Sequence, residues 1–415
     1  MSDSIIVKIE KLIYGGDGLA RLPDGRAVFV PFVLPGEEVS LNIIEEKPRF
    51  ARALPLEIIK PSPKRITPLC KHFGTCGGCH YQHIPYQDQL IFKREILLDQ
   101  LTRIGKISDP PLSSILPSPE TWHYRNHMQF HPDSDGQLGF VDITGQVVFP
   151  IQECHLPQDL ISDTWPKISL DANSGINKAS LRQDSFDEVL LLLEGEEETP
   201  PEMDLDLPIS AAYLNPSGFS YTMAGNDTLA YKIKYKILQV SAESFFQVNT
   251  IQAEKMVDFI LDSIDKVNTK EILELYSGVG LFSIFLAEFA DHLTAVESAI
   301  SSCYDFAANL DAFDNVSLYE ATVDEALPGL SIKPDLVLLD PPRAGLTKQA
   351  RDLILQMQSP QVLYISCDPA TLARDLKQFL SAGYRLESIA AFDMFPQTYH
   401  VETMTVLRRT QRVTS

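Results

Sequence analysis

One cysteine near the C-terminus of this 415-residue chain, Cys367, could take part in a chemical reaction. It lies in the stretch YISCDPATLARDL, residues 364–376. Residues 364–366 have the pattern of the end of a buried strand, and residues 370–376 have that of a helix. Cys367 is therefore expected on a strand-to-helix turn, where α/β enzymes place reactive groups. The thiol could be a buried apolar side chain, a metal ligand or a nucleophile.

A second set of cysteines could bind metal. Cys70, Cys76 and Cys79 form a tight trio with glycines between them, and Cys154 follows much later. Four thiolates can hold zinc or an iron–sulfur cluster. Zinc sites usually use two Cys-x-x-Cys pairs, so a three-plus-one arrangement favours a [4Fe–4S] cluster over zinc or unrelated free thiols.

A glycine-rich turn and two strand-final carboxylates point to a nucleotide-like ligand. The stretch ELYSGVGLFS contains Gly278 and Gly280, which allow a tight turn and a close approach of the backbone to a ligand. Glu297 ends the next expected strand, where it could accept hydrogen bonds from ribose hydroxyls. Ser283 stands where a dinucleotide fingerprint needs a third glycine, which argues against NAD. Asp340 ends a further strand in DLVLLDPPRAGL, at the sheet edge where ligands bind.

The elements that must position these residues alternate between strand and helix after residue 236. This rhythm predicts a doubly wound parallel sheet. Its strands are expected at 271–276, 293–297, 316–321, 335–340 and 361–366. Two last strand-like runs, 384–395 and 401–409, predict a closing antiparallel pair. Residues 236–415 are therefore expected to form a Rossmann-like catalytic domain.

Two further domains are expected before it. Residues 1–60 have short β-branched runs separated by GGDG, PDG and PGE turns, which predict a small OB-like barrel. Residues 61–235 are expected to form a β-rich central domain that contains the four cysteines. An apolar stripe at helical spacing predicts a helix within 85–105. The acidic stretch 184–206 is expected to be a solvated surface loop.

The charge of the chain is unfavourable for nucleic acid overall, with a net charge of −21. Residues 1–106, however, hold 15 Lys and Arg against 12 Asp and Glu. A local basic face is expected there, formed by Lys47, Arg49, Arg52, Lys60, Lys64, Arg65 and Lys71. No run of 18 apolar residues suggests a membrane span, and the N-terminus does not read as a signal peptide, so we expect a cytoplasmic protein.

Together, the motifs ELYSGVG, VE, DPPR and SCDP resemble those of class I S-adenosylmethionine-dependent methyltransferases. More narrowly, they are similar to the RNA uracil-C5 methyltransferases, and the N-terminal barrel resembles a TRAM domain. The resemblance implies that the cofactor contacts Gln247, Tyr276, Gly278, Glu297 and Asp340. The spacing of the four cysteines is that of the branch with a [4Fe–4S] cluster.

The resemblance also assigns the chemistry. Uracil C5 becomes nucleophilic when a thiolate adds to C6, and a base must later remove the C5 proton. Cys367 is implied as the nucleophile and Glu402 as the proton acceptor. The residues alone leave other readings open, since a strand-end cysteine is often buried filler and a strand glutamate often faces solvent. Residues 124–126 match a YRN element of the family, which predicts RNA contact.

Two further residues have simpler interpretations. The stretch SFFQVN around Gln247 could instead provide buried phenylalanines and Asn249 as a helix N-cap. Cys303 is expected to pack within a helix.

The sequence thus predicts a monomeric three-part enzyme that methylates C5 of a uridine in RNA, and 23S rRNA is the favoured substrate. The alternatives are a tRNA-specific enzyme and a non-catalytic RNA-binding protein on the same fold. An amino-group methyltransferase is a further alternative, against which Arg343 and Cys367 argue.

Overall fold

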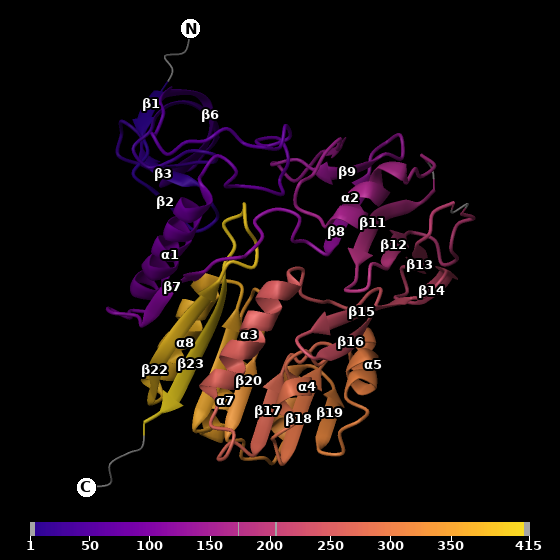
Figure 1. The fold of residues 1–415 in the computed structure, drawn as a ribbon. Helices are drawn as coiled ribbons and strands as arrows, with labels where there is room; N and C mark the ends of the chain where they lie inside the picture. Colours follow the sequence, from indigo (N-terminus) through magenta and orange to yellow (C-terminus); the bar gives the residue numbers. More distant parts are fainter. Residues whose placement is uncertain (1–4, 173, 204–205, 411–415) are drawn as a thin grey trace.

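The computed structural model describes residues 5–172, 174–203 and 206–410. Three sheet-containing parts follow one another along the chain (Figure 1). The N-terminal sheet and the central sheet both lie at one end of the large C-terminal sheet. A β-rich N-terminal part and a C-terminal sheet with parallel strands are thus present as the sequence predicts, while the OB-like barrel form of the N-terminal part stays a prediction.

The N-terminal part is a six-stranded sheet around its own core. Its strands follow the order β1-β5-β6-β4-β3-β2, and Val28, Val30, Val39 and Ala51 are fully buried inside it. The tight turns fall at the glycines that the sequence marks as turn signals. The strands are β1 (Ile5–Lys8), β2 (Lys11–Leu12), β3 (Gly18–Arg21), β4 (Ala27–Val30), β5 (Glu38–Glu46) and β6 (Phe50–Lys60).

The central part is a seven-stranded sheet with the order β10-β9-β8-β11-β12-β13-β14. Helix α2 (Asp159–Thr164) and a 3₁₀ turn (Trp165–Lys167) cover it, and Phe130 stacks on Trp165 in the core. The strands are β8 (His127–Pro132), β9 (Leu138–Val141), β10 (Val148–Pro150), β11 (Ile176–Gln183), β12 (Val189–Gly195), β13 (Ser210–Leu214) and β14 (Ser220–Ala224).

The acidic stretch 184–206 is only partly the surface loop that its charge suggested. Strand β12 lies within it, because the apolar run VLLLL is buried in the middle of the central sheet. Residues 196–199 are exposed as expected. The averaged charge of the stretch concealed a strand whose side chains are buried on both faces.

The C-terminal sheet has eight strands in the order β19-β18-β17-β20-β21-β23-β22-β7. The first five are parallel, and β23 is antiparallel to both of its neighbours, which confirms the predicted closing pair. The strands are β17 (Glu271–Leu275), β18 (His292–Glu297), β19 (Val316–Glu320), β20 (Leu336–Leu339), β21 (Gln361–Ser366), β22 (Tyr384–Phe392), β23 (Glu402–Arg409) and β7 (Leu112–Leu116).

Helices cover both faces of this sheet because its strands are apolar on both sides. One face packs on α3 (Thr250–Ser263), α4 (Ser283–Leu286), α5 (Ile300–Asn309) and the hairpin β15 (Thr228–Ile233)–β16 (Lys236–Ser241). The other packs on α1 (Tyr86–Arg103), α6 (Val323–Ala326), a 3₁₀ turn (Leu327–Gly329), α7 (Lys348–Met357) and α8 (Pro369–Ser381).

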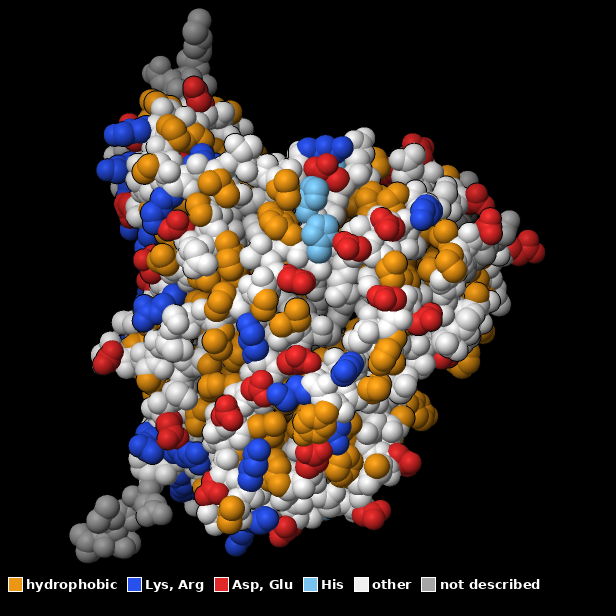
Figure 2. All heavy atoms as spheres, viewed as in Figure 1, with side chains coloured by type: hydrophobic (Ala, Val, Ile, Leu, Met, Phe, Trp, Pro, Cys, Tyr) orange, Lys and Arg blue, Asp and Glu red, His pale blue; other side chains and the backbone are white. Residues whose placement is uncertain are grey.

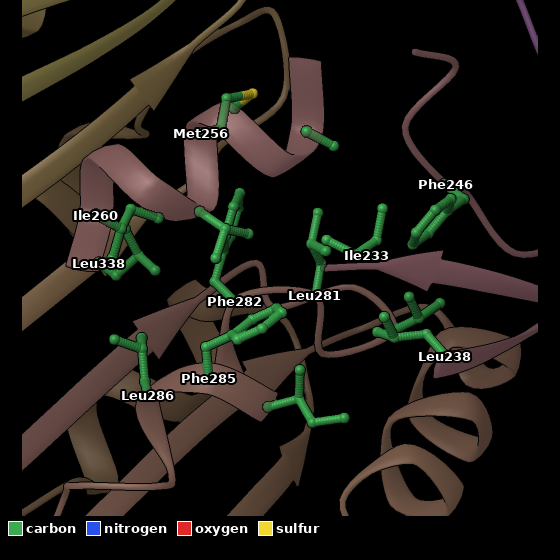
Figure 3. Close-up of a cluster of buried hydrophobic side chains, with 14 of the residues drawn as sticks. Ile233, Leu238, Phe246, Met256, Ile260, Leu281, Phe282, Phe285, Leu286 and Leu338 are labelled. Carbon is green, nitrogen blue, oxygen red and sulfur yellow. The ribbon is translucent and has the colours of Figure 1, made fainter. Parts of the chain in front are cut away.

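One cluster of buried side chains ties the glycine-rich turn to its supports (Figure 3). Leu281 and Phe282, directly after that turn, lie between the hairpin side chains Ile233 and Leu238 and the α3 side chains Met256 and Ile260. Packing of the apolar residues that follow the turn therefore holds it in place, while the backbone of the turn itself faces the neighbouring cavity.

Helix α1 and strand β7 precede the C-terminal domain in sequence but pack on it. Strand β7 pairs with β22, and α1 contacts α8. Lys93 of α1 forms a fully buried ion pair with Asp393, with 2.5 Å between Nζ and Oδ1. The predicted division into domains 61–235 and 236–415 stays a prediction. The structure adds that α1 and β7, which belong to the first range in sequence, pack on elements of the second. Within the described residues, no helix combines the length and apolar character needed to cross a membrane.

Candidate active site

The residues expected to bind the cofactor and to do chemistry line one cavity of about 860 Å³. The cavity lies at the carboxyl edge of the parallel strands, where ligands of such sheets bind. It brings together all seven predicted residues: Gln247, Tyr276, Gly278, Glu297, Asp340, Cys367 and Glu402. Residues from six separate segments of the sequence therefore meet in one place.

The antiparallel pairing of β21 and β23 places Cys367 opposite Glu402. Ser366 is paired with Thr403, and the Thr403 hydroxyl donates to the Ser366 carbonyl at 2.9 Å. Extending this register by one residue past the end of β21 pairs Cys367 with Glu402. Cys367 is half-buried and Glu402 is buried at the floor of the cavity. A thiol and a carboxyl group thus face the same small volume.

The charges around this pair are mostly negative. Burial, with the carboxyl groups of Glu402 and Asp340, raises the pKa of the Cys367 thiol to about 12. Burial and Asp340 raise the pKa of Glu402 well above its usual value, and Arg343 opposes both shifts. Burial and Glu297 raise the pKa of Asp340 to about 7. The cavity therefore favours a ligand that brings positive charge.

Hydrogen bonds fix the turn that carries Cys367. The Asp368 carboxylate caps helix α8 by accepting from the backbone N–H of Ala370 at 2.9 Å and of Thr371 at 2.8 Å. The Ser366 hydroxyl accepts from the Asp368 N–H at 3.1 Å. Both neighbours of Cys367 are therefore anchored, which leaves the thiol with a defined position.

The glycine-rich turn has the backbone that its sequence demands. Gly278 has a φ of +55°, and no atom lies within 4 Å of where its Cβ would stand, so its backbone is open to the cavity. Tyr276 also has a positive φ of 65°, an unfavourable conformation for a residue with a side chain and one common at functional sites. Glu297 accepts from the Gly278 N–H at 2.9 Å and from Ala299 at 2.8 Å.

A buried carboxyl group under this turn was not anticipated from the sequence. Glu274 of β17 is buried, and burial raises its pKa to about 8. Its Oε2 accepts from the Ser283 hydroxyl at 2.5 Å. Ser283 occupies the position of the missing third glycine, so the serine has a structural role of its own there. The available signal in the sequence was a glutamate between two leucines, Leu273 and Leu275, of a predicted buried strand.

The reading of SFFQVN as a helix N-cap with buried phenylalanine is confirmed for Asn249 and Phe246 but not for Phe245, which is exposed, and the cofactor role of Gln247 stays a prediction. The Asn249 side chain caps α3 by accepting from the Gln252 N–H at 3.2 Å. Gln247 lines the cavity, and Phe246 is buried behind it. Cys303 is buried on α5, as expected for helix packing.

The cavity has a second wall that sequence reasoning did not identify. His400 accepts from the Arg343 guanidinium with 2.9 Å between Nδ1 and the arginine nitrogen. Burial and Arg343 lower the pKa of His400 to about 3, so its ring is neutral. His80 and Tyr399 lie edge to face beside it, with ring centroids 4.6 Å apart. His400 stands two residues before Glu402, and only this proximity signalled it.

The predicted YRN contact with RNA is largely wrong. Tyr124 is buried and donates to the Pro396 carbonyl at 3.1 Å, and the Asn126 side chain is buried and donates to the Gln247 carbonyl at 3.0 Å. Both tie the central domain to the catalytic part. Only Arg125 lines the cavity, because alternation along an extended segment turns it to the opposite side from its neighbours.

The four clustered cysteines meet in the structure. Cys70, Cys76, Cys79 and Cys154 line a cavity of about 190 Å³. Burial and the other three cysteines raise the pKa of the Cys79 thiol, and backbone N–H groups of His72 and Gly78 point at the sulfurs of Cys70 and Cys76. Among the described residues, no three Cys, His, Asp or Glu side chains are arranged to hold a single metal ion.

A third cavity, of about 710 Å³, lies between the N-terminal barrel and the rest of the chain. It shares Gly77 and His80 with the large cavity and Cys76 and Cys79 with the cysteine cavity. Aromatic side chains of the N-terminal part, Tyr14, Phe29 and Phe32, line it together with Arg52, which pairs with Asp17 and Glu45 of the same cavity.

The expected basic face of the N-terminal part is largely neutralised. Five of its seven residues form ion pairs with carboxylates: Lys47, Arg52, Lys60, Lys64 and Arg65. Arg65 is structural, since its guanidinium binds the buried Glu37 through two contacts of 2.7 Å. Figure 2 shows Lys and Arg interspersed with Asp and Glu on the face viewed. Counting charges by sequence segment could not reveal this pairing.

The comparisons with known proteins agree with this geometry. A family model described as tRNA (Uracil-5-)-methyltransferase matches residues 226–410, and a TRAM domain model matches residues 4–56. An RNA methyltransferase of Aquifex aeolicus is 33% identical over 96% of this chain and 97% of its own. The 23S rRNA (uracil(1939)-C(5))-methyltransferase RlmD of Colwellia psychrerythraea is 30% identical over 98% of this chain and 96% of its own.

A solved structure is similar along the whole chain. The tRNA (uracil-54, C5)-methyltransferase of Pyrococcus abyssi, in complex with S-adenosyl-L-homocysteine, superposes with a TM-score of 0.74 and 25% identity. The similarity covers 97% of this chain and 100% of that one. This chain therefore belongs to the S-adenosylmethionine-dependent RNA (uracil-C5)-methyltransferases, with a TRAM domain at its N-terminus.

Proposed function

We propose that this enzyme methylates C5 of one specific uridine through a covalent bond between Cys367 and uracil C6. The observation that carries the proposal is the juxtaposition of Cys367 and Glu402 across β21 and β23, inside the cavity that contains Asp340 and Glu297. A methyltransferase acting on an amino group would need no thiol at this point. The pairing of a thiol with a buried carboxyl group favours C5 chemistry.

The residues present fit S-adenosylmethionine. The ribose would be held by Glu297 beside the open backbone of Gly278, and Gln247, Tyr276 and Asp340 would complete the site. The cofactor supplies an electrophilic methyl group and brings positive charge, which suits a cavity lined by several carboxyl groups. The volume of about 860 Å³ is adequate for the cofactor and leaves space toward Cys367.

In the proposed reaction, Cys367 forms and later breaks one bond to the uracil, and Glu402 takes up one proton. The Cys367 thiolate adds to uracil C6, which leaves C5 nucleophilic and able to accept the methyl group. Glu402 removes the C5 proton, and the Cys367–C6 bond breaks as the C5–C6 double bond forms again. Arg343, held by His400, lies beside Cys367 and offsets part of the surrounding negative charge.

We propose that the four cysteines Cys70, Cys76, Cys79 and Cys154 bind a [4Fe–4S] cluster in the central domain. They surround one cavity with an apolar wall; Cys79 is buried and the other three are half-buried, and four thiolates brought this close together would require a cationic centre. Iron and sulfide analysis of anaerobically purified protein tests this assignment.

We propose 23S rRNA as the substrate, with tRNA as the alternative. The 23S rRNA methyltransferase of Colwellia psychrerythraea is 30% identical to this chain, and the tRNA methyltransferase of Pyrococcus abyssi is 25% identical to it. The TRAM domain, with Tyr14, Phe29 and Phe32 in the third cavity, would bind the RNA on either side of the target uridine. The uridine itself would be flipped out of the RNA into the large cavity. A cytoplasmic, monomeric enzyme remains the expectation.

Methyl transfer by wild type and by Cys367→Ala tests the proposed function. Both proteins are incubated with labelled S-adenosylmethionine and with 23S rRNA or tRNA lacking 5-methyluridine. We expect transfer to one RNA only, and none with the variant. Full transfer by Cys367→Ala would exclude the covalent route, while no transfer by wild type to either RNA would favour a non-catalytic RNA-binding protein.

A further inference from the structure

A side chain of the N-terminal part, Tyr14, forms a hydrogen bond with the turn that carries Cys367. Tyr14 lies in the short turn between β2 and β3, and its hydroxyl donates to Asp368 with 2.5 Å between the tyrosine oxygen and Oδ2. Asp368 directly follows Cys367. The two partners of this bond are 354 residues apart in the sequence.

Asp368 uses its two oxygens for two different tasks. Oδ1 accepts from the N–H groups of Ala370 and Thr371 and so begins helix α8. Oδ2 is left for Tyr14. Because both oxygens are engaged, the carboxylate cannot rotate freely, and the backbone that carries Cys367 is fixed from the barrel side as well as from α8.

The turn that carries Tyr14 is itself held rigidly. The Gly16 N–H bonds to the Ile13 carbonyl at 3.1 Å, and a Cβ at Gly16 would stand 3.0 Å from Cδ1 of Tyr399. The rings of Tyr14 and Tyr399 meet edge to face at 5.9 Å. The side chain of Lys11, in the preceding strand, bonds to Asp99 of α1 at 2.8 Å. The barrel therefore meets the catalytic part at a close and directional contact.

Tyr14 also lines the third cavity, between the barrel and the rest of the chain. The residue thus lies between the surface that would grip RNA and the turn that holds the nucleophile. Burial and Asp368 both raise the pKa of the Tyr14 hydroxyl, which keeps it protonated as a donor.

We propose that Tyr14 is a positioning residue for the reaction: through Asp368, it holds Cys367 in place for attack on uracil and couples the barrel to catalysis. The inference rests on the proposed role of Cys367 as the nucleophile. It predicts that removal of the Tyr14 hydroxyl slows addition to uracil without weakening the binding of RNA or cofactor.

The test uses Tyr14→Phe, which retains the ring contact with Tyr399 and removes only the hydroxyl. The matched control is Tyr235→Phe, which removes another tyrosine-to-carboxylate bond, to Glu288, on a hairpin outside the cavity. In vitro transcripts of 23S rRNA and tRNA carrying 5-fluorouridine serve as probes, because fluorine at C5 cannot be removed as a proton and the covalent adduct accumulates.

We expect Tyr14→Phe to slow adduct formation about tenfold at saturating RNA, because a hydrogen bond to a carboxylate no longer orients the turn. With unmodified RNA, kcat should fall by a similar factor while the KM values for RNA and cofactor stay unchanged. The control should behave as wild type, and all three proteins should melt at the same temperature.

A second variant links the effect to Asp368. Asp368→Asn keeps an oxygen for the helix cap but weakens the bond with Tyr14, so adding Tyr14→Phe to it should slow adduct formation little further. An unchanged adduct rate in Tyr14→Phe, or a loss confined to RNA affinity, would overturn the inference. Absence of any adduct with wild type would instead refute the proposed function itself.

Discussion

Replacement of Glu402 by glutamine tests the division of labour between the two reactive residues. Glutamine has nearly the same size, so the packing of β23 against β21 and β22 should be preserved. It cannot accept the C5 proton. The reaction should then proceed through addition and methylation and stop before the Cys367–C6 bond breaks.

The expected magnitude follows from the structure. A positioned general base typically contributes a factor of about 10²–10⁴, so turnover should fall by that amount. Addition should not suffer, because the Glu402 carboxyl group opposes ionisation of Cys367 when it is charged, and glutamine carries no charge at any pH. Neighbours across a strand pair lie roughly 5 Å apart, where a unit charge at an effective dielectric of about 20 is worth roughly 3 kcal/mol. Loss of the carboxyl group should therefore lower the pKa of the thiol, although burial, the larger cause of the shift, remains.

The assay follows the RNA and the protein together. Glu402→Gln is incubated with RNA and with cofactor labelled in its methyl group, and the mixture is separated on a denaturing gel. We expect a stable protein–RNA adduct that carries the label, together with little released product. Wild type should release product without accumulating adduct, and Cys367→Ala should form neither.

The matched control is Glu387→Gln on the neighbouring strand β22, where the carboxylate pairs with Arg408 at the surface. This variant should turn over normally. Wild-type turnover by Glu402→Gln would show that another group accepts the proton. A loss of turnover with no adduct would place the defect before addition and would refute the assignment of Glu402 as the base.

Three further outcomes are expected. Cofactor affinity measured by calorimetry should rise as pH increases through about 7, because ionised Asp340 binds a cation better than its neutral form does, and Asp340→Asn should remove this dependence. Lys93→Met should lower the free energy of unfolding by about 3–5 kcal/mol in urea titrations, because it leaves buried Asp393 without its partner; an unchanged value would contradict the ion pair. Cys79→Ser should lose the bound iron and the visible absorption of the cluster but still bind cofactor, while Cys303→Ser should retain both; iron at wild-type levels in Cys79→Ser would argue against the cluster.

Local patterns predicted the catalytic sheet well because each signal was short-range. The run QVLYIS is a strand with the predicted ends, and strand-final residues such as Glu297 and Asp340 reach the same edge because parallel strands must align. The four cysteines meet in one cavity, as their spacing suggested. The role of the seven site residues stays a prediction, but their convergence is a structural fact.

Sequence patterns could not show how distant segments share one site. Strand β7 pairs with β22, although nearly 270 residues separate them, and no local pattern encodes such a pairing. The YRN element failed for a related reason, since burial of Tyr124 and Asn126 depends on the segment 394–398 and on residues 247–248 lying against them. Ion pairs such as Arg65 with Glu37 likewise formed across turns that a charge count treats as separate.

The placement of charge reconciles an acidic chain with an RNA substrate. The proposed chemistry needs carboxyl groups where the cationic cofactor binds and where a proton is removed, and Glu297, Asp340 and Glu402 are gathered there. Phosphates would be repelled from such a cavity, so only the uncharged uracil ring can enter it at low cost. Arg125 and Arg343 are the arginines among the residues lining that cavity, and Arg343 offsets part of the negative charge beside Cys367. The net charge of −21 is thus no obstacle to the proposed reaction, because part of the acidic charge lies where the cationic cofactor would bind.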